Sequence, residues 1–159
     1  MASSEPSFLI VNCGNTHVST AVFSSDGEEA LHLDSVQSVQ LAYDFTDEGS
    51  WLEALSDAVR QLKRELTLPG KGIFILPGNQ ILTKQLQVPH VDPVKQRQII
   101  AVEAQQSVHQ FDQLGWDSQV LHDDGIEADV LFLAAKKTDL KQFYDAMKRA
   151  GVVPTEITA

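Results

Sequence analysis

The residues whose types and spacing could do chemistry lie in one short segment, Asn12-Cys13-Gly14-Asn15-Thr16. It follows an apolar run that begins at Phe8 and combines a glycine with amide and hydroxyl side chains. A strand, a glycine-containing turn and a returning strand can direct backbone N–H groups at a phosphate. The same residues suit a hairpin turn that binds nothing, because Gly and Asn favour tight turns. Spacing alone favours the plain turn, since short glycine patterns often occur by chance.

No other residue set predicts a catalytic or metal site. Cys13 is the single cysteine, which excludes an internal disulfide, and we interpret it as a small core residue. Asp123-Asp124-Gly125 lacks the alternating ligands of a calcium loop and is interpreted as a charged hairpin turn. Trp116-Asp117 is interpreted as a packing anchor beside a charge at a strand edge. The histidines show no i,i+4 pairing: His17, His32, His90, His109 and His122.

Composition limits the class of protein. The chain has 159 residues, 43% of them apolar, and a net charge of −10 from 22 acidic and 12 basic residues. Residues 1–59 contain no Lys or Arg. This charge argues against a nucleic-acid binder. No apolar run approaches the ~20 residues of a membrane span, and no signal sequence begins the chain, so we expect a cytoplasmic protein.

The first part of the chain predicts three strands, a helix and a fourth strand. The strands cover residues 8–13, 18–23 and 30–39, with a turn at 24–27 whose Gly27 takes a positive φ. Ser50 and Glu53 fit a capping box at the start of an amphipathic helix that ends at Pro69-Gly70. The fourth strand covers 72–76. A lobe boundary follows at Pro77-Gly78.

The second part predicts an α+β lobe of strand, helix, two strands, helix and strand. Its strands cover residues 80–88, 116–121, 129–135 and 152–157. Asp92 is the expected N-cap of a helix that has Pro93 at its first position and runs to about Val108. Thr138 is the expected cap of the last helix, and Gly151 ends it.

Five segments occur in an order that resembles a known family. They are Leu86-Gln87-Val88-Pro89, residues 103–111, Trp116-Asp117, Ala134-Ala135-Lys136-Lys137 and residues 150–154. Together they resemble PilM, the actin-like cytoplasmic protein of type IV pilus assembly, which is related to FtsA. Residues 9–23 are similar to the first phosphate loop of actin-like ATPases. The resemblance covers about residues 8–158.

The resemblance implies a fold of α/β and α+β parts. Residues 7–77 would be the first half of an actin-like (ASKHA) subdomain 1A, and residues 78–151 would be an SHS2-like small lobe, subdomain 1C. Residues 152–159 would form a strand that returns towards subdomain 1A. The family continues into a second actin-like half, so the chain resembles an N-terminal half and looks truncated.

The resemblance also implies a degenerate phosphate loop. Asn12, Gly14, Asn15 and Thr16 would face the phosphates of a nucleotide. The family has Asp where this chain has Asn12 and Lys where it has Ser19. A neutral amide lacks the carboxylate that Mg²⁺ prefers, and phosphoryl transfer depends on such charges. We therefore expect no hydrolysis and no cofactor for this chain, with ATP and Mg²⁺ only in a full-length parent.

The implied partner is a PilN-like inner-membrane protein. Its cytoplasmic tail would bind a groove between residues 8–77 and 78–151, and the chain would be peripheral to the inner membrane. A bared face of subdomain 1A, including Asn12–Thr16, would favour self-association. Two alternatives remain. Residues 11–16 resemble the opening of type III pantothenate kinases, and a GspL-like protein of type II secretion would share the actin-like part.

Overall fold

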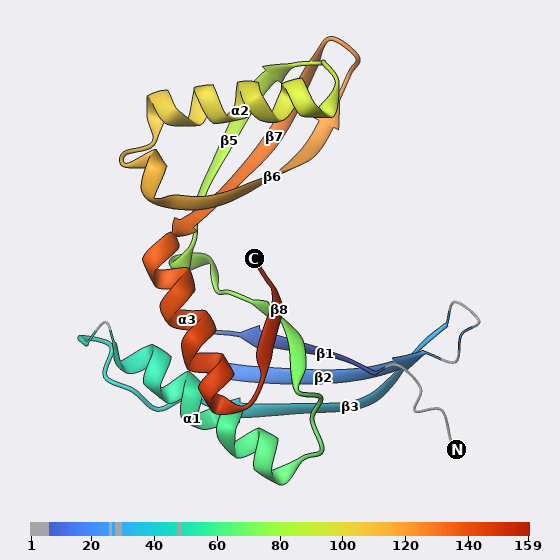
Figure 1. Ribbon diagram of the computed structural model, residues 1–159, viewed down its shortest axis with the longest axis vertical. Helices are drawn as coiled ribbons and strands as arrows, with labels where there is room; N and C mark the ends of the chain where they lie inside the picture. Colours follow the sequence, from blue (N-terminus) through green and yellow to red (C-terminus); the bar gives the residue numbers. More distant parts are fainter. Residues whose placement is uncertain (1–6, 26, 28–29, 48) are drawn as a thin grey trace. The chain divides into compact units, whose positions relative to one another are not determined.

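The computed structural model describes residues 7–25, 27, 30–47 and 49–159. They form two compact units (Figure 1). The first unit contains the described residues up to Pro77 together with Gln142–Ala159, and the second consists of Gly78–Lys141. Among the described residues, no helix is long and apolar enough to cross a membrane.

The first unit is built on a five-stranded mixed sheet of order β3-β2-β1-β4-β8. Strands β1 to β3 form an antiparallel meander, and β4 and β8 continue the sheet in parallel. The terminal strand therefore belongs to the first sheet. The strand bounds are β1 Ser7–Cys13, β2 His17–Ser25, β3 Leu31–Gln40, β4 Lys71–Ile75 and β8 Val153–Thr158.

Two helices, α1 (Ser50–Glu65) and α3 (Lys137–Ala150), pack on one face of this sheet. Trp51 of α1 stacks on Phe143 of α3 with ring centroids 6.5 Å apart. Phe143 also meets the edge of Phe74 on β4, at 5.5 Å. Phe74 is fully buried and pairs in register with buried Val11 of β1. The alternate residues of β1, β2 and β4 thus bury one face of the sheet against both helices.

The boundary expected at residue 151 differs from the observed division. The chain from Gln142 onward belongs to the first unit. The reason is that Phe143, Ala146 and Met147 of α3 are buried with the first sheet's core residues rather than within the second sheet. A helix belongs to the unit whose residues cover its apolar face. The spacing of apolar residues along the chain predicts that face but does not identify the residues that cover it.

Two of the four predicted helix signals are wrong. Gly49, without a side-chain cap, is the N-cap of α1, and the Ser50 hydroxyl instead accepts the Asp44 N–H at 3.1 Å. Helix α3 begins at Lys137, directly after a strand that ends at Lys136, so Thr138 lies inside the helix and is not its cap. A turn before α1 and a strand before α3 replace the expected side-chain caps.

The other two helix signals and the glycine turns are confirmed. Asp92 accepts the Lys95 N–H at 3.1 Å as the N-cap of α2 (Pro93–Ser107). Gly151 ends α3 with φ +106°, and Gly27 has φ +83°. Of the turn expected at residues 24–27, Ser24 and Ser25 belong to β2, and Asp26 lies outside the described residues.

The second unit is a three-stranded antiparallel sheet of order β5-β7-β6 with α2 packed on one face. Its bounds are η1 Gly78–Gln80, β5 Leu82–Pro89, η2 Phe111–Gln113, β6 Leu114–Asp123 and β7 Glu127–Lys136. Ile100 and Ala104 of α2 are buried with Val88 of β5 and Phe132 of β7. The two units therefore have separate apolar cores.

Candidate functional site

The turn between β1 and β2 contains Gly14, Asn15 and Thr16, three of the four residues predicted to face a phosphate. The Gly14 N–H donates to His17 O over 2.8 Å. A Cβ at Gly14 would lie 2.7 Å from that same oxygen, so a side chain does not fit there. Thr16 Oγ1 lies 2.9 Å from His17 Nδ1. Gly14 is thus required by close backbone approach.

Residues from the segment 41–51 hold this turn from outside. The three carbonyl oxygens of residues 14–16 each accept one hydrogen bond, and the two aromatic donors lie far away in sequence. Trp51 and Tyr43 each carry a polar N–H or O–H group on an apolar ring, and such a group usually finds a hydrogen-bond acceptor when the ring is buried. The three bonds run from Trp51 Nε1–H to Gly14 O (3.0 Å), from Tyr43 O–H to Asn15 O (2.7 Å) and from Leu41 N–H to Thr16 O (2.7 Å).

Asn12, the fourth predicted residue, lies in a row of neutral side chains across the sheet. It pairs with Ser19 on β2 and Ile75 on β4, and Ser19 pairs with Ser38 on β3. Ser19 Oγ donates to Ser38 Oγ at 3.1 Å. The row offers amide and hydroxyl groups but neither a carboxylate for a hard cation nor a basic group for a phosphate. Among the described residues, no group of three or more His, Cys, Asp or Glu could hold a metal ion.

Cys13, beside this turn, is a core residue, as the sequence indicated. Its side chain is 1% exposed. Burial raises the pKa of the Cys13 thiol to about 12, because a thiolate would lose its hydration there. The thiolate is the reactive form, so Cys13 is not a nucleophile at neutral pH.

A groove between α1 and α3 is the hollow that sequence reasoning missed. It is an open groove of about 610 Å³, and all of its lining residues belong to the first unit. Leu52 and Ala146 line it beside charged residues of both helices, and Arg60 pairs with Asp57 at 2.8 Å. The spacing of charges along one helix gave no sign of it, because the groove needs two helices that are distant in sequence. The charged lining residues are Glu53, Asp57, Arg60, Asp145 and Arg149.

In the second unit, Trp116 is the packing anchor that the sequence indicated. Its ring packs on Phe132 with centroids 5.5 Å apart. Arg97 of α2 lies 4.3 Å from the Trp116 ring centre and donates to Asp117 at 3.0 Å. The Ser118 backbone N–H and then Arg97 lower the pKa of Asp117. Arg97 therefore ties α2 to β6 through a cation–π contact and an ion pair.

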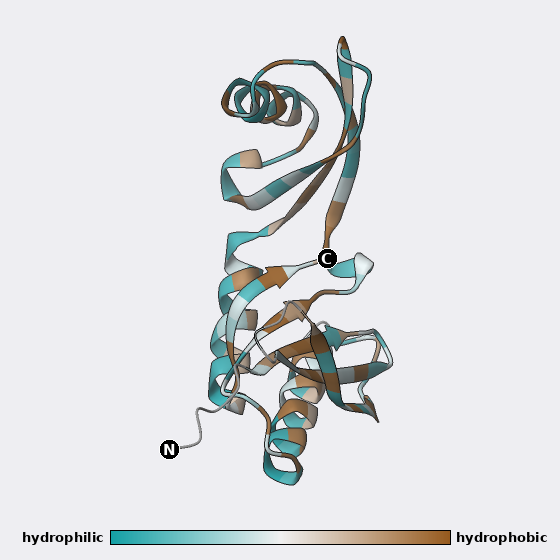
Figure 2. Cartoon of the chain, turned by 90° about the vertical axis from the view of Figure 1, so that its right-hand side faces the viewer, coloured by the Kyte–Doolittle hydropathy of each residue, from teal (hydrophilic) through white to brown (hydrophobic). Residues whose placement is uncertain are grey.

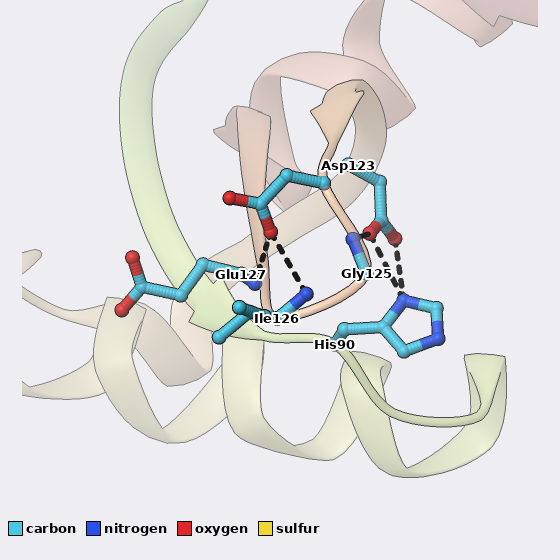
Figure 3. A network of polar contacts seen from close by, with 6 residues as sticks. His90, Asp123, Gly125, Ile126 and Glu127 are labelled. Atoms are coloured by element: carbon cyan, nitrogen blue, oxygen red, sulfur yellow. Dashed lines mark hydrogen bonds and ion pairs between the residues drawn. The ribbon is translucent and has the colours of Figure 1, made fainter.

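The turn between β6 and β7 is the charged hairpin expected at Asp123-Asp124-Gly125 (Figure 3). Asp124 Oδ1 accepts the backbone N–H groups of Ile126 and Glu127, both at 2.8 Å. Asp123 accepts the Gly125 N–H at 2.8 Å. Asp123 also lies 2.8 Å from His90 Nδ1. These carboxylates hold backbone groups and a histidine of the same protein, which explains the cluster without an ion.

Hydrogen bonds lower the pKa values of both turn carboxyls. For Asp123 the largest cause is the His90 side chain, followed by the Gly125 N–H. For Asp124 the largest cause is the Glu127 N–H, followed by the Ile126 N–H. Hydrogen bonds to the ionised form favour it, so each carboxylate stabilises the turn while it is charged.

The sequence matches no family model and no curated protein. Solved structures are similar. A chain of a PilM–PilN type IV pilus biogenesis complex superposes with a TM-score of 0.79 and 18% identity, over 96% of this chain and 47% of that one. The cytoplasmic domain of EpsL, an inner membrane component of the type II secretion system of Vibrio cholerae, superposes with a TM-score of 0.58 and 13% identity, over 96% and 57%.

The shared property is the fold. The superpositions establish how the chain is folded. At sequence identities below one fifth they do not establish what the chain does. The chain has a mixed α/β fold similar to that of the chain in the PilM–PilN complex, and it spans about half the length of the solved chains it matches. The likeness covers nearly all of this chain, which includes both units.

Proposed function

We propose that this chain is a PilM-like, actin-like interaction module of type IV pilus assembly. It acts by binding the cytoplasmic tail of an inner-membrane PilN-like protein. The observation that carries this proposal is the superposition of 96% of the chain on a chain of a PilM–PilN complex at a TM-score of 0.79. In this proposal the chain is cytoplasmic and reaches the inner membrane through its partner.

The acidic first part of the chain supports a partner tail that contains Lys or Arg. Residues 1–59 include ten acidic residues and no basic ones. Complementary charge speeds association and fixes register more than it adds affinity. Binding of such a tail therefore depends on ionic strength, and screening weakens it as salt rises.

The α1–α3 groove is the surface of the first unit that we propose to test first for the tail. Leu52 and Ala146 offer apolar contact, and Glu53 offers a carboxylate to a basic side chain, whereas Asp57 is already paired with Arg60. An extended peptide recognised this way places apolar side chains in pockets and polar ones along the rim. The groove expected between residues 8–77 and 78–151 stays a separate prediction.

The binding test uses a fluorescently labelled peptide of the PilN-like tail and a scrambled peptide of the same composition. Anisotropy should rise with the native peptide and not with the scrambled one. Leu52→Arg, which fills the groove, should weaken binding at least tenfold. Val102→Arg adds the same charge on α2 of the second unit, where Val102 is 53% exposed, and should leave the affinity unchanged.

Equal affinity of the two peptides would refute the proposed partner. Native-peptide binding that Leu52→Arg does not change would keep the partner and reject the α1–α3 groove as its site.

We also propose that this chain does not hydrolyse ATP. Asn12 and Ser19 are neutral, and the Gly14 N–H, one of the groups a phosphate would use, already donates to His17 O. Phosphate release in the presence of Mg²⁺ and ATP should equal the buffer blank. Turnover well above that blank, abolished by Thr16→Val with the fold intact, would contradict this.

A second candidate is the cytoplasmic part of a type II secretion protein. The superposition on the EpsL domain at a TM-score of 0.58 favours it, but less strongly. Deletion of the gene in its native organism separates the two. Loss of surface pili with secretion intact supports the pilus function, and the reverse supports secretion.

A further inference from the structure

The α1–α3 groove lies between two helices that run in the same direction. Near their starts, Trp51 of α1 stacks on Phe143 of α3. Near their ends, a Cβ added to Gly151 would lie 3.2 Å from Lys63 Cγ, so the residue that closes α3 lies against the last turn of α1. Figure 1 shows the C-terminal ends of both helices on the same side of the first unit. One end of the groove is therefore formed by the N-terminal parts of both helices, and the other by their C-terminal parts.

Residues of opposite charge line these two ends. Glu53 lies in the first turn of α1, and Arg149 lies in the last turn of α3. Arg149 precedes Gly151 by two residues and Arg60 precedes Lys63 by three, so both arginines lie at the C-terminal end of the groove. The helix dipole favours acidic side chains at a helix N-terminus and basic ones at its C-terminus. Because the two helices are parallel, the same preference gives the groove one acidic and one basic end.

Two of the charges in the groove are not used within the protein. Asp57 and Arg60 are paired with each other at 2.8 Å, and Asp145 also has a partner. Among the described residues, neither Glu53 nor Arg149 forms an ion pair, and both are exposed. A ligand that offers a basic group to Glu53 and an acidic group to Arg149 therefore neutralises both charges without breaking an existing pair.

The middle of the groove makes little polar demand on a ligand. Leu52 is half-buried, and Ala146 is buried. The Ser56 hydroxyl donates to the Leu52 carbonyl oxygen of its own helix at 2.8 Å, so its proton is already used. Figure 2 shows apolar (brown) and hydrophilic (teal) residues mixed along α1, the lowest helix in that view. This lining suits an apolar side chain of an extended peptide, with charged side chains on either side of it.

Helix geometry sets the spacing of the charges that such a peptide needs. Arg60, at the same end as Arg149, follows Glu53 by seven residues, which is about 10 Å along α1 at 1.5 Å per residue. An extended peptide advances about 3.3 Å per residue and places every second side chain on the same face. Residues two or four positions apart on that face are thus about 7 or 13 Å apart. Long charged side chains accommodate the remaining difference.

We propose that the α1–α3 groove selects a segment with a basic and an acidic residue two or four positions apart, the basic one at Glu53 and the acidic one at Arg149. This inference rests on the proposed function, because it names the chemistry of the tail that occupies the groove. It adds a requirement that the acidic first part of the chain does not give, namely an acidic residue in the tail. A charge order of this kind fixes the register of a bound peptide more than it adds affinity.

The test adds a charge-inverted tail peptide to the anisotropy assay. In this peptide each Lys or Arg becomes Glu, and each Asp or Glu becomes Lys. Glu53→Lys combined with Arg149→Glu reverses the charge order of the groove at constant net charge. The native tail should bind this double variant roughly tenfold more weakly than the wild type, because two attractions become repulsions. The inverted tail should bind the double variant more tightly than it binds the wild type.

The matched control is Glu65→Lys combined with Lys148→Glu. It makes the same exchange of one acidic residue on α1 and one basic residue on α3, at exposed positions outside the groove lining. Its affinity for the native tail should stay within about twofold of the wild type, since exposed charges away from a ligand contribute little. Circular dichroism and thermal unfolding check that both double variants fold. All four substituted residues are exposed, so we expect near-native melting temperatures.

The outcomes separate this inference from the proposed function. A native tail that does not bind the wild type refutes the proposed partner and this inference with it. A native tail that binds the wild type and the groove variant equally leaves the partner intact and overturns the charge order. The charge order is also overturned if the inverted tail binds the groove variant no better than the wild type. A binding tail with no acidic residue two or four positions from a basic one has the same consequence.

Discussion

The two hairpin turns described above differ in where their side-chain hydrogen bonds come from. In the β6–β7 turn, the carboxylates of Asp123 and Asp124 accept backbone N–H groups two and three residues away, and His90 adds one contact from a distance. The β1–β2 turn has one local backbone bond, from Gly14 N–H to His17 O, and its side-chain donors are Trp51 and Tyr43, at separations of 37 and 28 residues. A turn held locally forms with its own hairpin, whereas a turn held from afar depends on the packing of α1.

The largest predicted change in stability that separates the two turns comes from substitution of Trp51. Trp51→Ala removes the donor to Gly14 O and the stacking on Phe143, and we expect a loss of about 3–5 kcal/mol in stability of the first unit. Trp51→Phe keeps most of the ring contact, loses the hydrogen bond and should cost less. Chemical denaturation, followed by hydrogen exchange of β1 and β7, checks this. A loss of protection in β7 equal to that in β1 would contradict the separate support of the two turns.

A smaller effect should follow from alanine at the two turn glycines. Gly14→Ala puts a Cβ 2.7 Å from the His17 carbonyl oxygen in a turn that three hydrogen bonds hold in place, and should cost about 2–3 kcal/mol. Gly125→Ala meets no atom within 4 Å and suffers only from its φ of +87°, which costs about 1 kcal/mol. Chemical denaturation with hydrogen exchange of β1 and β7, in a background that keeps both tryptophans, measures each unit. The reverse order of the two costs would show that backbone conformation outweighs close approach.

The smallest effect should be the acid sensitivity of the β6–β7 turn. The pKa values of Asp123 and Asp124 are lower in the folded state than their ordinary values. Their contribution to stability is therefore complete above the unfolded-state pKa, near 4, and is lost as pH falls through the folded-state values. The urea midpoint of the second unit should decrease from pH 5 to pH 2.5.

The control for this prediction is Asp124→Asn, together with His90→Gln. Asp124→Asn should reduce the decrease of the urea midpoint between pH 5 and pH 2.5, the acid branch of the curve, because one of the titrating groups is gone. His90→Gln should flatten it less, since it removes only the largest of the causes that lower the Asp123 pKa. An unchanged acid branch in both variants would mean that other carboxyls control it.

Sequence reasoning succeeded where the partner of a residue is near it in the chain. The Asp92 cap lies three residues from the N–H that it accepts, and the Asp124 turn is equally local. It failed for Ser50, whose capping-box pattern is correct in spacing but whose hydroxyl accepts the Asp44 N–H from the preceding turn. It also missed Trp51 and Tyr43 as supports of the β1–β2 turn, because neither acceptor lies within 25 residues of its donor.

Two further features depend on tertiary packing: the unit to which α3 belongs, and which faces of the first sheet are apolar. The apolar residues of α3 predict a helix with one buried face but not which sheet covers that face. The alternation at residues 18–23 predicts a strand, yet Val18 and Phe23 are both apolar and point to opposite faces. An apolar residue on each face indicates a sheet with two surfaces to cover, and the sequence does not say what covers the second.

The burial of Cys13 has a practical consequence for kinetics. As the single thiol of the chain, at 1% exposure and with a pKa of about 12, it reacts with a disulfide reagent only when β1 leaves the core. The rate of thiol labelling under native conditions therefore measures how the first unit opens. The second unit contains no thiol and does not contribute to this rate. At high reagent concentration the labelling rate becomes the opening rate itself, and at low concentration it reports the fraction of molecules that are open.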